Sequence, residues 1–142
     1  MSDYKVAIDI LSNRMKFLRA FGYDKPSVSI EQSVLLGNSL LLKYESTSDR
    51  NIEIGYSVNN QRPASATIFI SNSRGERFSL EDWVSCRLPN NIIRFAGKAQ
   101  EPEIEFLGQF SDGVEELLQG ALKSTLTGEA WDAVPFDWKG YR

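Results

Sequence analysis

The chain of 142 residues contains no histidine and a single cysteine, Cys86. Histidine is the commonest general base and the commonest metal ligand in proteins. Its absence excludes a Ser-His-Asp or Cys-His catalytic arrangement, and one thiolate cannot complete a zinc site of the usual Cys/His kind. One cysteine also excludes an internal disulfide, which agrees with a reducing compartment.

Long apolar runs are also missing. No apolar run is longer than three residues, as in Val34–Leu36 and Leu40–Leu42, whereas a membrane-spanning helix needs about 20 consecutive apolar residues. The first residues, Met1–Lys5, show no basic region followed by an apolar stretch and a cleavage site, so no secretion signal is visible. We therefore expect a cytoplasmic protein without a membrane-spanning segment.

The overall composition is that of an ordinary folded domain, with 42% hydrophobic and 25% charged residues. The length fits one domain, and we expect residues 1–142 to form it. The net charge of −3 is unevenly distributed: residues 1–100 carry thirteen Lys/Arg against ten Asp/Glu, and residues 101–142 carry three against nine. An acidic C-terminal third without clustered Lys and Arg argues against a nucleic-acid partner.

The apolar pattern predicts helices at both ends of a β region. Residues 4–21 have a helical period, with Ser2 or Asp3 as the expected N-cap and Gly22 as the end. From about residue 28 to 80 the period changes to two, which predicts an antiparallel meander. Ser79 then starts a short helix, and a second long helix is expected to start near Ser111 or Asp112.

These elements together predict an α+β fold. We expect an antiparallel β-meander of four to six strands, packed in two layers against the N-terminal and C-terminal helices. Arg14 is the exception in the first helix, because it falls inside the apolar arc. Either its stem packs on the core edge while its guanidinium reaches water, or the side chain takes part in a buried ion pair or a partner contact.

Glu101, Glu103 and Glu105 form an acidic cluster that alternates with Pro102 and Ile104. If this segment is a strand, the three carboxylates share one face. They are then either solvated, part of a recognition surface or, less favourably, a weak divalent-cation site. Because the calcium-binding loop spacing is missing, we expect no metal.

The last residues combine aromatic and acidic side chains. Residues 129–142 form an aromatic tail that is expected to be partly ordered, with Trp131, Phe136, Trp138 and Tyr141. These side chains either fold back to close the core or stay exposed as interface anchors. The candidate partner-binding residues are Glu101, Glu103, Glu105, Asp112, Glu115, Glu116, Trp131, Trp138 and Tyr141.

Motifs for catalysis and cofactors are missing as well. The chain has neither of the glycine-rich phosphate-binding signatures. Cys86 lies beside Arg87, which favours a reactive thiolate, but a lone cysteine without histidine is more often a small packing residue. We expect no catalytic residues and no cofactor.

Three segments carry a family resemblance: Leu40–Ser46, Ile52–Tyr56 and the strand-to-helix passage Phe78–Trp83. Together with the helical start, which brings the span to roughly residues 5–85, they resemble the small immunity proteins of bacterial polymorphic-toxin and contact-dependent-inhibition systems. The resemblance implies a cytoplasmic protein that binds one cognate toxin domain and blocks its active site or its activation.

Three functional hypotheses follow. The first is a non-catalytic binding domain, most concretely an immunity protein whose acidic C-terminal third meets a basic toxin domain. The second is an adaptor, a secretion chaperone or a phage-type structural subunit, which would self-associate through an apolar surface. The third is a carboxylate-dependent metal enzyme, which requires Glu101, Glu103 or Glu105 to converge in a pocket. The oligomeric state is open.

Overall fold

The computed structural model describes residues 4–33, 37–47, 49–59, 62–88 and 93–131. It contains a five-stranded antiparallel sheet in which each strand pairs with its neighbour in the chain. The strands are β1 (Ser27–Ser33), β2 (Gly37–Glu45), β3 (Arg50–Asn59), β4 (Arg62–Asn72) and β5 (Arg77–Ser79). The predicted α+β meander is therefore confirmed.

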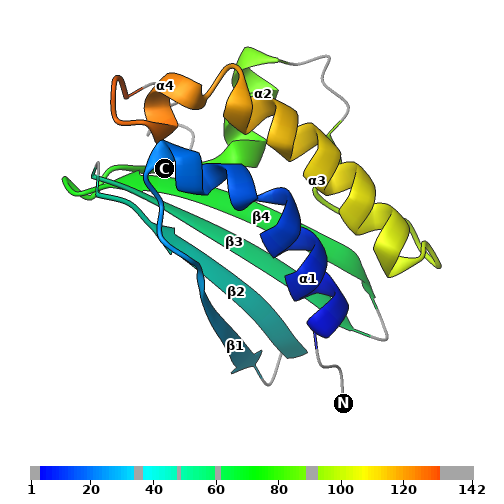
Figure 1. Cartoon of the computed structure of the whole chain (residues 1–142). Coiled ribbons are helices and arrows are strands. Elements are labelled where there is room, and N and C mark those ends of the chain that lie inside the picture. The colour runs from blue at the N-terminus through cyan, green and yellow to red at the C-terminus, as the bar shows by residue number, and fades with distance from the viewer. Residues whose placement is uncertain (1–3, 34–36, 48, 60–61, 89–92, 132–142) are drawn as a thin grey trace, which may run out of the picture.

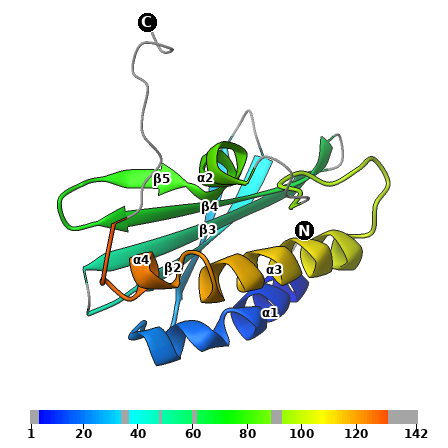
Figure 2. The same ribbon diagram turned by 90° about the horizontal axis from the view of Figure 1, so that it is seen from above.

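The helices form the second layer. Helix α1 (Lys5–Arg14) continues as the 3-10 helix η1 (Lys16–Phe21) and lies beside α3 (Glu103–Gln119), which is followed by α4 (Lys123–Leu126) (Figure 1). Figure 2 shows α1 and α3 together on the same side of the sheet. Helix α2 (Leu80–Arg87) follows β5 and packs against β4 and β5.

Alternation along the strands produces the core. Leu40, Leu42 and Tyr44 of β2 are buried and stand opposite Tyr56, Ile54 and Ile52 of β3, which in turn stand opposite Ala66, Ile68 and Ile70 of β4. Side chains of successive strand residues point to opposite faces. The intervening residues, such as Lys43 and Glu53, therefore lie on the other face, where they are partly exposed.

The structure confirms two predicted helix boundaries, the end of η1 and the start of α2. Gly22 has φ +99°, the left-handed conformation that glycine adopts at least cost, and it ends η1. The hydroxyl of Ser79 accepts a hydrogen bond of 3.1 Å from the Asp82 N–H and caps α2. Ser2 and Asp3, the expected cap of α1, lie outside the described residues.

The start of the second long helix was predicted wrongly. Helix α3 begins at Glu103, so Glu103 and Glu105 lie in its first turn and not on a strand. Carboxylates are favourable there because the helix dipole places positive charge at the N-terminus. Ser111 is not a cap, since its hydroxyl donates to the Leu107 carbonyl at 2.6 Å inside the helix.

The aromatic tail is described up to Trp131. The Trp131 ring is partly buried and packs edge-on against Phe78, with 5.3 Å between ring centroids, and the Arg50 guanidinium lies 5.0 Å from its ring. Arg50 also donates to the carbonyls of Thr125 at 2.9 Å and Ala130 at 3.0 Å. Trp131 thus closes the core, whereas Phe136, Trp138 and Tyr141 lie outside the described residues.

The expectation for Cys86 is wrong. Its side chain is exposed on α2 and does not pack in the core. The buried face of this helix is formed by Leu80, Trp83 and Val84, and a residue two positions beyond Val84 points away from that face.

Candidate functional site

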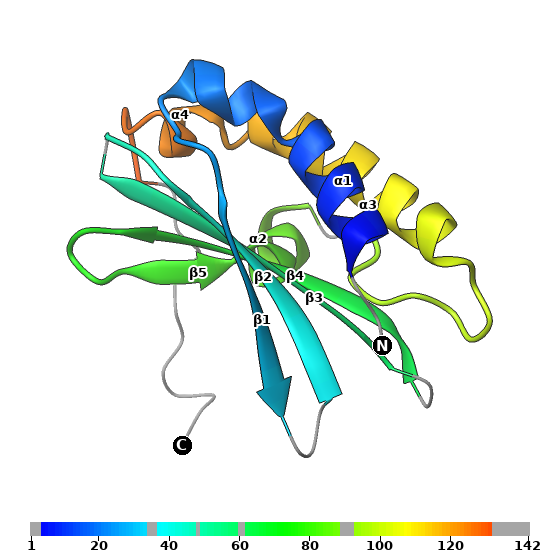
Figure 3. The same ribbon diagram turned by 60° about the horizontal axis from the view of Figure 1, so that its bottom comes forward.

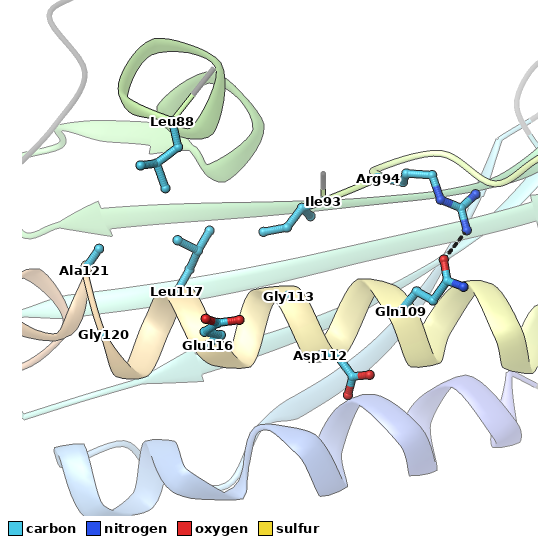
Figure 4. Close-up of a pocket in the computed structure, with 10 residues that line it drawn as sticks. All are labelled: Leu88, Ile93, Arg94, Gln109, Asp112, Gly113, Glu116, Leu117, Gly120 and Ala121. Carbon is cyan, nitrogen blue, oxygen red and sulfur yellow. Dashed lines mark hydrogen bonds between the residues drawn. The ribbon is translucent and has the colours of Figure 1, made fainter. Parts of the chain in front are cut away.

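A groove of about 600 Å³ runs beside α3, and its lining includes the end of α2 and the segment at residues 93–94. Leu88, Ile93 and Leu117 form its apolar part, and Figure 4 shows Leu88 and Leu117 facing each other across it. Ligand pockets in proteins span about 300–1,000 Å³. The groove is therefore large enough for one or two side chains of a partner.

A glycine shapes the floor of this groove. A Cβ atom built on Gly113 would lie 2.6 Å from Cγ1 of Ile93, closer than real Cβ contacts allow. Because glycine has no side chain, Ile93 can pack directly on the α3 backbone at Gly113. Figure 4 shows Ile93 beside this part of α3. The sequence pattern does not predict this contact, because residues 93 and 113 lie in separate segments of the chain.

The exposed face of α3 is acidic. Glu105, Gln109, Asp112 and Glu116 follow one another at helical spacing, and Gln109, Asp112 and Glu116 also line the groove. The sequence of α3 contains five acidic residues and no Lys or Arg, hence −5, whereas α1 and η1 together contain four basic residues and one Asp, hence +3. The two neighbouring helices therefore carry opposite charge.

Arg14 joins these two helices. Its guanidinium forms an ion pair with Asp112 and another with Glu115, in which Nη1 donates to Oε2 at 3.0 Å. Arg14 therefore forms an ion pair, but its side chain is 38% exposed and the pair is not buried, as that alternative expected. The Glu115 carboxylate raises the pKa of Arg14. Of the predicted acidic residues, Asp112 and Glu115 are thus partly neutralised within the chain.

Glu101 is also engaged within the chain. Arg94 donates to both of its carboxylate oxygens, at 2.9 and 2.7 Å, and the Lys98 N–H donates at 2.9 Å. The ion pair with Arg94 and this backbone hydrogen bond lower the pKa of Glu101 to about 2. Arg94 also donates to Gln109 at 2.6 Å, so it fixes one end of the groove (Figure 4).

Glu103 faces the core and not the groove. The Tyr56 hydroxyl donates to its carboxylate at 2.9 Å. Burial and this carboxylate both raise the pKa of Tyr56, so the phenol keeps its proton and remains the donor. Glu105 is exposed on the first turn of α3.

The predicted acidic cluster is therefore divided among three environments. Glu101 pairs with Arg94, Glu103 contacts Tyr56, and Glu105 points to solvent. Within residues 4–131, as far as the structure describes them, no three Asp, Glu or Cys side chains come close enough to hold a metal ion. The convergence that a carboxylate-dependent metal site needs is not found there.

The structure brings together only part of the predicted partner-binding set. Asp112 and Glu116 lie in the groove, Glu105 lies on the same face of α3, and Trp131 is partly buried elsewhere. Trp138 and Tyr141 lie outside the described residues. The sequence analysis did not predict the apolar groove residues Leu88 and Ile93. They flank Pro89 and the Asn90–Asn91 pair, residue types that are typical of surface loops and could have indicated them.

Comparisons with known proteins give no relative. No protein-family model matches the chain, and neither a curated protein nor a solved structure matches it. None of the helices in the described part of the chain is both long and apolar enough for a bilayer crossing.

Proposed function

We propose that this chain is a non-catalytic protein-binding domain, and more specifically an immunity protein that binds and neutralises a cognate bacterial toxin domain. The observation that carries the proposal is the groove beside α3, which combines an apolar floor with an acidic rim. Protein interfaces commonly have this composition, with an apolar centre and a polar edge.

The charge of α3 selects the kind of partner. Glu116 and Glu105 are exposed, and neither forms an ion pair with another described residue. A partner with Lys or Arg around an apolar side chain would match this surface, because opposite charges speed association and favour one orientation. A basic toxin domain, such as a nuclease, has this chemistry.

The proposed partner can be captured with the purified chain. The wild-type protein, immobilised at moderate salt, is expected to retain one stoichiometric basic polypeptide from a lysate of its source. Glu116→Lys combined with Leu88→Ser should abolish retention, since it reverses the rim charge and removes an apolar contact. Glu31→Lys is the matched control, because Glu31 is exposed on β1 at the opposite edge of the sheet.

The captured polypeptide is then expressed alone and together with the chain. Growth arrest that the wild type and the Glu31→Lys variant relieve, and that the groove variant does not, would support an immunity function. Equal retention by the groove variant and the wild type would contradict the groove as the binding surface. A captured polypeptide that does not affect growth would contradict neutralisation of a toxin.

A second candidate function has one observation in its favour. Val28 and Ile30 are each 47% exposed on β1, an edge strand of the sheet. They stand opposite the buried Leu42 and Leu40, so they continue the apolar face of the sheet onto β1, the strand beside β2 in Figure 3. Exposed apolar edge strands pair with other chains, which favours an adaptor, a chaperone or a self-associating structural subunit. A defined homo-oligomer in sedimentation, lost in Ile30→Lys, would support this alternative.

A further inference from the structure

A second cavity, of about 330 Å³, lies beside the C-terminal end of α1 and helix η1, and no residue of α3 lines it. It is lined by Ser12, Met15, Lys16, Arg19, Asp24, Lys25, Pro26 and Tyr44. The cavity thus lies between the end of α1, helix η1 and the residues that lead into β1. Continuing the pairing of Ser27 with Lys43 by one residue places Pro26 opposite Tyr44.

The rim of this cavity is basic. Lys16, Arg19 and Lys25 contribute three positive charges against the one negative charge of Asp24. Within the described part of the chain, no carboxylate forms an ion pair with any of the three cations. A local excess of positive charge in a protein of net charge −3 attracts an anionic group.

Tyr44 lines the cavity, but its hydroxyl group is not reachable from it. The hydroxyl of Tyr44 is buried, and it has no hydrogen-bond partner among the described residues. Solvent does not reach the hydroxyl oxygen, so a ligand in the cavity contacts the Tyr44 ring and not the hydroxyl. Burial raises the pKa of Tyr44 to about 12, so the phenol keeps its proton at neutral pH.

The remaining wall is apolar. Met15, Pro26 and the ring of Tyr44 form it, and the volume is at the small end of the range for ligand pockets. A bare inorganic anion would leave these apolar surfaces uncovered. A carboxylate that carries a short apolar body would satisfy both the cations and the apolar wall.

We propose that this cavity binds a small amphipathic carboxylate, present either as a free organic acid or as the C-terminal residue of a peptide. The carboxylate lies among Lys16, Arg19 and Lys25. The apolar body packs against Met15 and Pro26. This site is separate from the groove beside α3, and it does not depend on the proposed immunity function.

The experiment titrates the full chain with hexanoate, hexanamide and inorganic phosphate and follows backbone amide shifts by NMR. Saturable binding of hexanoate is expected, with shifts around Met15 and Lys25, while hexanamide and phosphate bind at least about tenfold more weakly because each lacks one of the two features. Saturable binding of none of the three probes up to tens of millimolar would overturn the proposal. So would equal binding of hexanoate and hexanamide, or of hexanoate and phosphate.

Two matched variants locate the site. Lys25→Glu and Lys98→Glu both replace an exposed lysine, but Lys98 precedes α3 at the other end of the helical layer (Figure 1). Lys25→Glu should weaken hexanoate binding by about tenfold or more, and Lys98→Glu by less than about twofold.

A third comparison distinguishes the two sources of the carboxylate. A tripeptide that ends in leucine is compared with its C-terminally amidated form. If the free tripeptide binds at least as well as hexanoate and the amide does not, the ligand is a chain end; if hexanoate alone binds, it is a free acid. Equal effects of Lys25→Glu and Lys98→Glu on hexanoate binding would overturn the proposal. Lys16 and Arg19 would then only stabilise the C-terminal end of a helix, as cations commonly do.

Discussion

Alanine at Gly113 and alanine at Gly108 should change the stability of the chain in opposite directions. Both glycines lie inside α3, where replacing glycine by alanine favours the helix by about 1 kcal/mol. At Gly108 no atom lies within 4 Å of the added Cβ. At Gly113 the added Cβ would lie 2.6 Å from Cγ1 of Ile93 and 3.2 Å from its Cδ1.

The magnitudes follow from these contacts. Gly108→Ala should raise the free energy of unfolding by about 0.5–1 kcal/mol. Gly113→Ala gains the same helix propensity but must displace Ile93, and overpacking of this kind costs about 1–3 kcal/mol. Gly113→Ala should therefore be less stable than Gly108→Ala by about 1–3 kcal/mol, as measured by urea unfolding at constant slope m.

A double mutant identifies the cause. In an Ile93→Ala background the atom that clashes is gone, so Gly113→Ala should become stabilising by about 0.5–1 kcal/mol, like Gly108→Ala. The reasoning fails if Gly113→Ala and Gly108→Ala stabilise the wild type equally, or if Ile93→Ala leaves the difference between them unchanged.

Three further substitutions test other contacts. Arg50→Met removes hydrogen bonds to two backbone carbonyls from a buried guanidinium and should cost about 3–5 kcal/mol in chemical unfolding; a loss under about 1 kcal/mol would contradict the anchoring role. Tyr44→Phe removes a buried hydroxyl without a partner and should raise stability by about 1 kcal/mol without ligand, so a clear loss in thermal unfolding would argue against an unpaired hydroxyl. The pKa of Glu101 is lowered from 4.5 to about 2 by the Arg94 ion pair, so this pair stabilises the fold above about pH 4.5 and is lost as the pH falls towards 2. Glu101→Gln should flatten acid unfolding curves over that interval, and curves parallel to wild type would refute the assignment.

The sheet was predictable because its signal is local. Tyr44, Ile54 and Ile68 each lie in a stretch where buried and exposed residues alternate, and that period of two is sufficient to place a half-buried strand. The start of α3 was not predictable in the same way. The segment Glu103–Phe106 alternates over a few residues, which fits a strand as well as the first turn of a helix, and the interior glycines Gly108 and Gly113 further weaken the helical signal.

The candidate sites depended on long-range contacts. Arg14 could be recognised as an exception to its helix pattern, but its partner Glu115 is 101 residues away in the chain. The basic cavity likewise brings Tyr44 of β2 together with Met15 and Arg19, which lie much earlier in the chain. Single-sequence periodicity contains no information on such distances, which explains why both the groove and the basic cavity were missed.

The opposite charges of the two neighbouring helices give the molecule an electric dipole across its helical layer. The basic α1 and η1 lie beside the acidic α3. Positive and negative charge are therefore separated across the layer, although the net charge is small. In the field of a charged surface the protein will rotate before it makes contact, presenting α3 to cations and α1 to anions. Because mobile ions screen this torque within about 10 Å at 0.1 M salt, orientation will be strongest in dilute buffer, where ion-exchange resins of both signs should retain the protein.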